Sequence, residues 1–328
     1  MIVGLQNKKK KYCRWWWGIL AAVILVTAAI IINWAWICDW YRGVSYQPTD
    51  AMVDIRDALD LTSNGRFLFD AAQPALNDAE SFNANCRKDE SNIAVLGCYL
   101  AGNIYIYDVE AEELEGIREA TAAHELLHAV WARTNEDKKK DLLLMLEEVY
   151  NDNLSILEEE VEAYDESERT EEIFVRVGTE ITVLTEELEK YYGEVFNDRQ
   201  KIVEYYRSYI SVFKEIKERM AALVEEIEGL SAKITEMMEM YEAQADQLEA
   251  DIVSFNSCAE IAGCFAGEDD FYDQRAALIA RKNELVGIND QINNIINEYN
   301  EKVEEYNADV TESHKLQNMI NSKNEIDI

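Results

Sequence analysis

Residues 121–131 have the sequence TAAHELLHAVW, and they lie in a segment of helical periodicity that spans 110–133. Acidic residues crowd the start of this segment, as the dipole of a helix favours. Apart from two histidines and one glutamate, the quoted stretch is apolar nearly all round. This pattern predicts a helix buried within a folded domain.

The two histidines of this helix, His124 and His128, are four residues apart. This spacing places both imidazoles on one face, where each can present a nitrogen to the same ion at roughly 2.0–2.1 Å. Glu125 is rotated by about 100° from His124, which keeps it out of the coordination shell but near a water on the metal, whose proton it can accept. Buried histidines need partners, so the pattern predicts a metal site. The alternative is a pair of histidines on the solvent side of the helix.

The segments around this helix predict a small α+β domain. The apolar spacing of 50–61 and of 138–150 is typical of helices, and helices continue from Glu171. A short run at 66–69 is strand-like. Residues 93–100 and 104–107, separated by Ala101-Gly102-Asn103, predict a β-hairpin.

Residues 191–328 have the composition and spacing of a helical coiled coil. The segment 297–310 repeats after seven residues, with tyrosines at Tyr299 and Tyr306 and valines at Val303 and Val310. The helical pattern lapses at 256–270. We therefore expect a long antiparallel coiled-coil hairpin with its tip there, on the order of 75 Å long at 1.5 Å per residue.

The first forty residues predict a membrane anchor. Residues 1–14 carry five basic side chains, and 15–37 are almost uncharged, with tryptophans clustered at both ends. The positive-inside rule makes 1–14 a cytoplasmic tail, 15–40 a transmembrane helix of the cell membrane, and the bulk of the chain extracellular. A cleaved secretory signal is the alternative, but no small-x-small cleavage site follows the apolar run.

The cysteines and the net charge agree with an exported protein. Close cysteine pairs in an oxidising compartment predict the disulfides Cys86–Cys98 and Cys258–Cys264, with four free buried thiols as the alternative. The 65 acidic and 31 basic residues give a formal net charge of −34, which argues against binding to nucleic acid.

The HELLH sequence and its surroundings resemble the zincin metallopeptidases, specifically the gluzincin type. The resemblance rests mainly on 121–131 and covers about 49–190, which predicts a zincin-like metallopeptidase domain at 45–190. Residues 103–108 precede the motif helix as the substrate-flanking edge strand does in such enzymes. Residues 178–180 end a segment that looks like the glutamate helix of bacterial membrane-anchored members. The resemblance implies Zn²⁺ as cofactor and a peptide or protein substrate.

The third ligand is a glutamate on a later helix in the family that the chain resembles. The resemblance favours Glu172, whose apolar neighbours suggest partial burial. Glu147 follows His128 by nineteen positions, a spacing seen in several gluzincins, and Glu180 is a further alternative. A donor to the developing oxyanion is also needed, and the candidates are Arg176, Tyr150 and Tyr164.

Two hypotheses for function follow. In the first, the protein is a membrane-anchored extracellular zinc endopeptidase with Glu125 as general base, and the hairpin is a spacer, substrate gate or oligomerisation arm. In the second, it is a surface interaction or scaffold protein that acts through its coiled coil, with an inactive zincin-like domain. The presence of Glu125 favours the first, because a structural zinc site needs no base. In either case the coiled coil is a candidate surface for a homo-oligomer or a protein partner.

Overall fold

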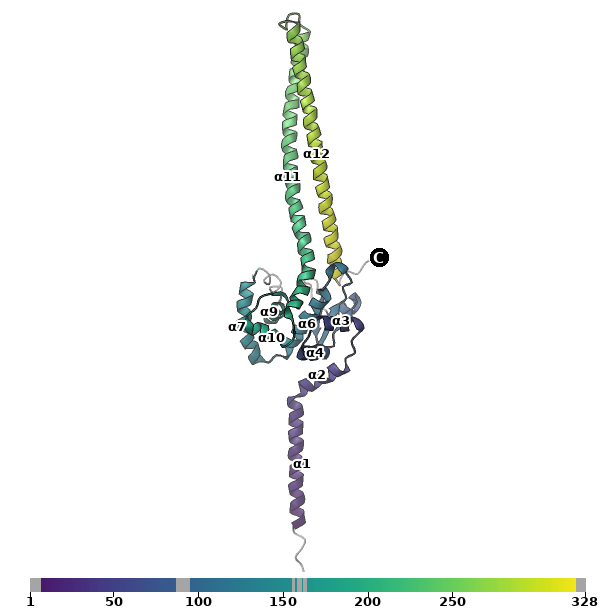
Figure 1. The fold of residues 1–328 in the computed structure, drawn as a ribbon, viewed down its shortest axis with the longest axis vertical. Helices are drawn as coiled ribbons and strands as arrows, with labels where there is room; N and C mark the ends of the chain where they lie inside the picture. The colour runs from purple at the N-terminus through teal and green to yellow at the C-terminus, as the bar shows by residue number, and fades with distance from the viewer. Residues whose placement is uncertain (1–6, 87–94, 155–156, 158–160, 162–163, 323–328) are drawn as a thin grey trace, which may run out of the picture. The chain divides into compact units, whose positions relative to one another are not determined.

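The computed structural model describes all residues except 1–6, 87–94, 155–156, 158–160, 162–163 and 323–328. The chain divides into two compact units, one made of Met1–Val212 with Gln317–Ile328 and the other of Phe213–Leu316. The described residues are mostly helical, and a three-stranded sheet lies in the first unit (Figure 1).

The N-terminal helix α1 (Asn7–Ile32) contains an apolar window, Trp15–Ile32, that is long enough to cross a membrane. A second helix, α2 (Trp34–Ser45), follows the break at Asn33 and packs against α4. Arg42 of α2 donates hydrogen bonds to the carbonyl oxygens of Ala71 and Gly102, both at 2.8 Å. The apolar window ends at Ile32, whereas the predicted anchor extends to residue 40, and the polar side chain of Arg42 in α2 binds to the folded domain.

The next helices are α3 (Asp50–Ala58) and α4 (Ser63–Ala71). The predicted helix at 50–61 is confirmed over α3. The predicted strand at 66–69 is wrong, because this segment is the body of α4. The Thr62 side chain accepts a hydrogen bond from the backbone amide of Gly65 and caps that helix, while Phe69 is fully buried on its inner face.

The sheet has the order β1-β3-β2, with β1 (Ala75–Asn77) parallel and β2 (Gly97–Leu100) antiparallel to β3 (Asn103–Tyr107). The predicted hairpin is confirmed over β2 and β3, and residues 93–94 of its first arm lie outside the described residues. The prediction that 103–108 form an edge strand is wrong, because β3 pairs on both sides. Among the described strands, β1 and β2 are therefore the two edges of the sheet.

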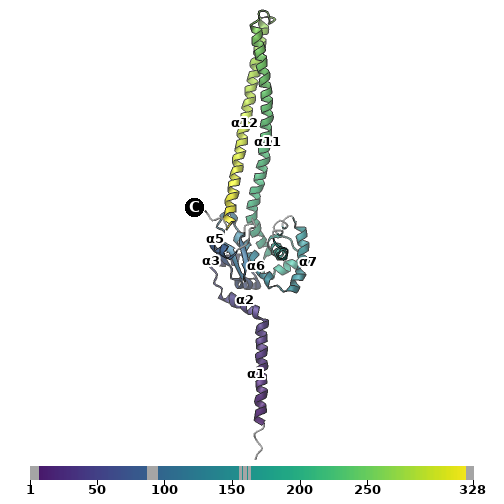
Figure 2. The same ribbon diagram turned by 180° about the vertical axis from the view of Figure 1, so that it is seen from behind.

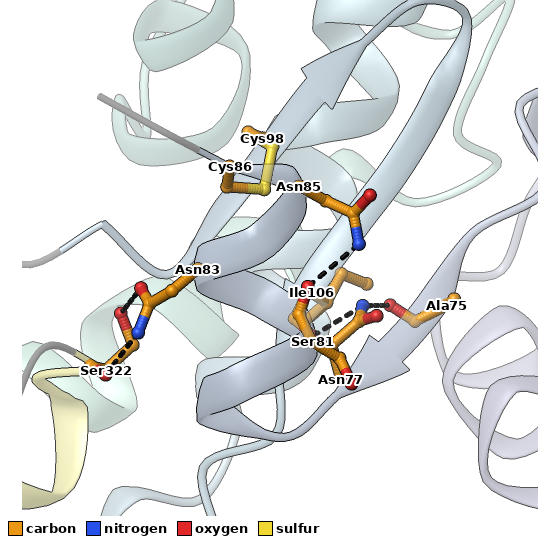
Figure 3. The surroundings of a disulfide bond; sticks show 9 residues. All are labelled: Ala75, Asn77, Ser81, Asn83, Asn85, Cys86, Cys98, Ile106 and Ser322. Atoms are coloured by element: carbon orange, nitrogen blue, oxygen red, sulfur yellow. Dashed lines mark hydrogen bonds between the residues drawn. A yellow bond between two sulfur atoms is a disulfide. The ribbon is translucent and has the colours of Figure 1, made fainter. Parts of the chain in front are cut away.

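Both predicted disulfides are present. Cys86, which ends α5 (Ala79–Asn85), is bonded to Cys98 on β2 (Figure 3). Near this bond, the Asn83 amide nitrogen donates to the carbonyl oxygen of Ser322 at 2.6 Å, and the Ser322 hydroxyl donates to the Asn83 side-chain oxygen at 2.9 Å. Ser322, near the C-terminal end of the described chain, is therefore tied to α5.

The predicted buried helix is α6 (Ile117–Arg133), preceded by a short 3₁₀ turn, η1 (Glu112–Leu114). It is followed by α7 (Glu136–Asp152), α9 (Glu166–Glu180) and α10 (Glu186–Tyr192). In Figure 2, the sheet and α5 lie on one side of α6, and α7 lies on the other. It packs against β2, β3 and α9, and its apolar side chains form the core with those of the sheet and α9.

Two long helices, α11 (Arg199–Ala259) and α12 (Glu268–Ile320), form the second unit over 213–316. They run antiparallel and side by side (Figures 1 and 2), and the disulfide Cys258–Cys264 closes the connection between them. Ion pairs join the helices at Arg219–Asp309 and Glu226–Lys302, with N–O distances of 2.8 and 3.1 Å.

Candidate metal centre

The two histidines of α6 face the same neighbour on α9. The ring centroids of His124 and His128 are 5.1 Å apart, and each side chain is about one-fifth exposed. Glu172 of α9 is buried between them, with only 1% of its side chain exposed. Its Oε1 is 3.7 Å from His124 Nε2, and its Oε2 is 3.5 Å from His128 Nε2. Packing of α9 on α6 therefore produces this cluster.

These three side chains fit a metal ion. Their ligand atoms lie within 4.8 Å of one another. Two ligands of a tetrahedral ion with bonds of roughly 2.0–2.1 Å are about 3.3–3.4 Å apart, close to the observed distances from Glu172 to the imidazoles. Within the described part of the chain, Glu172 Oε2 is buried and accepts no hydrogen bond. Because a buried carboxylate oxygen without a partner is costly, a cation at this position would remove the penalty.

The orientation of His128 is set by Glu171. Its carboxylate oxygen is 2.7 Å from His128 Nδ1, so the other ring nitrogen, Nε2, is turned toward Glu172. A carboxylate that holds the outer nitrogen of a histidine in this way is typical of metal-binding imidazoles. Burial lowers the pKa of His128, but the hydrogen bond that its Nδ1 donates to Glu171 and the carboxylates of Glu125 and Glu172 more than offset this effect, so the pKa is raised.

Arg176 fixes the carboxylate of Glu172 from the other side. Its Nε donates to Glu172 Oε1 at 2.7 Å, and its Nη1 donates to Glu180 Oε1 at 2.9 Å. Glu180 therefore lies in an ion pair with Arg176 and outside the group formed with the histidines. Glu147, the other alternative from the sequence, is exposed on α7. Of the three glutamates considered, the structure brings Glu172 to the histidines.

Glu125 lies against the edge strand β2. Its residue surface is 5% exposed. A Cβ atom built on Gly97 would be 2.7 Å from both Cγ and Oε1 of Glu125, so the backbone of β2 packs directly on this carboxylate. The same Cβ would also lie 2.7 Å from Cγ2 of Thr121, so a side chain at position 97 would displace Glu125, Thr121 or the strand itself.

Of the three candidates for the oxyanion donor, Tyr164 is the one whose hydroxyl is influenced by the charges of Glu172 and Glu125. Burial raises the pKa of its hydroxyl, the charges of Glu172 and Glu125 raise it further, and Arg176 lowers it. With its pKa raised, the hydroxyl stays protonated and can donate a hydrogen bond. Two donors of Arg176 are occupied by Glu172 and Glu180, and Tyr150 packs against the core cluster.

Two residues of this site, Glu171 and Gly97, were not predicted from the sequence. Glu171 is one of many glutamates in the chain, and nothing in its local sequence marks it as a partner of His128. Gly97 did carry a signal, because a glycine inside a strand often marks a close approach of another group to the backbone.

Comparison with known proteins found no relative of this chain. The chain matches no protein-family model, and no curated protein or solved structure is significantly similar to it. Function is therefore inferred from the chemistry of the site.

Proposed function

We propose that the protein is a membrane-anchored, extracellular zinc endopeptidase of the gluzincin type. In this proposal His124, His128 and Glu172 bind Zn²⁺ and Glu125 is the general base. The observation that carries it is the buried Glu172 carboxylate, whose Oε2 has no hydrogen-bond partner among the described residues and lies 3.5 Å from His128 Nε2. Two imidazoles and one carboxylate are a common donor set for catalytic zinc, which keeps its fourth position open.

Each residue of the site then has a chemical role. When bound, zinc would polarise the scissile carbonyl group and make a water molecule more acidic. Glu125 accepts the proton of that water and returns it to the leaving amine. Glu171 holds His128 in the tautomer that presents Nε2, and Arg176 holds Glu172. Tyr164 donates a hydrogen bond to the developing oxyanion.

The rest of the chain supports a location outside the cell. The apolar helix Trp15–Ile32 would cross the membrane with the basic N-terminal residues inside, and two disulfides are typical of an oxidising compartment. Buried or half-buried residues of α11 recur at alternating spacings of four and three: Leu223, Ile227, Leu230, Ile234, Met237 and Tyr241. This spacing supports a coiled-coil hairpin as the arm of the enzyme.

The test is hydrolysis of a peptide library by the full-length protein in detergent. We expect cleavage by the wild type and by Glu119→Gln, a control on the same helix, but none by Glu125→Gln, which should still bind zinc. Cleavage by Glu125→Gln at the wild-type rate would contradict the role of Glu125. Zinc binding without cleavage by any variant would favour the second hypothesis, a scaffold that acts through α11 and α12.

A further inference from the structure

One face of the second unit carries two rows of exposed apolar side chains. On α11, Val224, Met238 and Ile252 follow one another at intervals of fourteen residues and are 39%, 45% and 36% exposed. On α12, the interval is seven residues, and three side chains are 54%, 46% and 54% exposed: Tyr272, Ile279 and Val286. Multiples of seven keep each row in line along a helix that supercoils with its neighbour.

Both rows lie on the same side of the seam between the helices. The seam is formed by the buried and half-buried side chains of the two helices. On α11, Val224 and Met238 directly follow the seam residues Leu223 and Met237, whereas Arg219 precedes Met220 and therefore flanks the seam on the other side. On α12, Ile279 and Val286 likewise follow the seam residues Leu278 and Leu285. Arg219 pairs across the seam with Glu312, at 3.0 Å, which identifies the polar face on α12 as well. We call the side with the two rows the apolar face. The opposite face carries this ion pair and one exposed large apolar side chain of α11, Met240, at 45%.

The charges on the apolar face complement each other. Exposed carboxylates of α11, Glu242 and Glu249, line one edge of this face, and exposed basic residues of α12, Arg275 and Lys282, lie within it. The ion pair between Asp251 and Arg281 sets the register of the two helices, so Glu249 and Lys282 are level along the hairpin.

A second copy of the chain fits this pattern. Rotation by 180° about an axis parallel to the helices places α11 of one copy opposite α12 of the other at the same level. Glu249 then lies level with Lys282 of the second copy, and Ile252 lies level with Ile279. Such an interface is isologous, because the same surface patch of each copy forms the contact. A partner whose surface carried only positive or only negative charge would complement either the carboxylates of α11 or the basic residues of α12, but not both.

The extent of the face is sufficient for a stable dimer. The row on α11, from Val224 to Ile252, rises by about 42 Å at 1.5 Å per residue, and the row on α12, from Tyr272 to Val286, rises by about 21 Å. With each helix about 10 Å wide, the two rows cover about 630 Å² of each copy, so a dimer would bury about 1,260 Å² in total, at the lower end of the range for stable protein–protein interfaces. We propose that the apolar face binds a second copy of this chain and makes the arm a parallel two-fold dimer.

The first test is the mass of the full-length protein in detergent, measured by light scattering after size-exclusion chromatography. We expect two chains of 37.7 kDa for the wild type. The double variant Ile279→Glu/Val286→Glu should elute as one chain. Met240→Glu is the control, since Met240 is 45% exposed, close to the 46% of Ile279, but lies on the polar face, and this variant should remain a dimer. All of these positions are exposed, so circular dichroism should show an unchanged helix content.

The second test reverses charges without touching the apolar rows. Glu249→Lys should raise the dissociation constant of the dimer about tenfold, because two-fold symmetry breaks the contact twice. Adding Lys282→Glu should restore it. A monomeric wild type would overturn the proposal, as would a dimer that survives Ile279→Glu/Val286→Glu or one that Met240→Glu disrupts equally. Failure of the Lys282→Glu rescue would overturn the pairing of α11 with α12.

Discussion

Substitution of Gly97 by alanine should disable the proposed general base without removing the metal. The new Cβ would lie 2.7 Å from Cγ and Oε1 of Glu125, whereas ordinary contacts begin at 3.4 Å. Glu125 must therefore move by about 0.7 Å, or β2 must move away from it. Because a displacement of about 1 Å in a catalytic group can cost on the order of 10²-fold in rate, we expect kcat/KM to fall by about 10- to 100-fold.

The assay is cleavage of the best peptide from the library, with zinc content measured on the same samples. Gly287→Ala serves as the control, because no neighbouring atom lies within 4 Å of the Cβ that it would add. This control should have the wild-type rate. If Gly97→Ala kept full activity with a full complement of zinc, the claim that the backbone of β2 holds Glu125 in its catalytic position would be refuted.

Three further predictions concern the metal and the membrane. Glu171→Gln should weaken zinc binding by about 10- to 100-fold, because it removes the carboxylate that holds a histidine ligand. The control is Glu168→Gln, an exposed position on the same helix, which should leave zinc binding unchanged. Competition with a chelator measures the zinc affinity of both variants. Zinc affinity should fall as the pH is lowered toward 6.5. Burial opposes protonation of His128, but Glu171 and the nearby carboxylates raise its pKa, so at lower pH zinc must displace a proton from the imidazole. Equal affinity at pH 6 and pH 8 would be inconsistent with this prediction. A reporter fused after Ile328 should be accessible in intact cells, and its protection would rule out an extracellular enzyme.

The sequence was most informative where one helix contains the whole signal. The positions of His124, Glu125 and His128 within a single turn follow from helical periodicity alone, and the apolar residues between them predict burial of α6. The cysteine pairs and the apolar N-terminal helix were predictable for the same reason, because each is a local pattern.

Features that depend on packing between distant segments were not predictable in the same way. Glu172 was proposed from a resemblance, and only the contact of α9 with α6 separates it from Glu147 on α7. Glu180 lies on the same helix as Glu172, and only its ion pair with Arg176, outside the group with the histidines, sets it apart. The order of the sheet depends on β1, a strand of three residues whose sequence has no alternating pattern. The segment at 66–69 was misassigned because its apolar residues fit a short strand, and the cap from Thr62 was overlooked.

The zinc content of the full-length protein tests the central claim most directly. We predict about one zinc per chain by elemental analysis, and loss of stoichiometric binding in His124→Ala, His128→Ala and Glu172→Ala. His314→Ala is the matched control, because it removes the third histidine of the chain, which is exposed on α12. Binding that survives Glu172→Ala, or that depends equally on His314, would contradict a metal centre formed by α6 and α9.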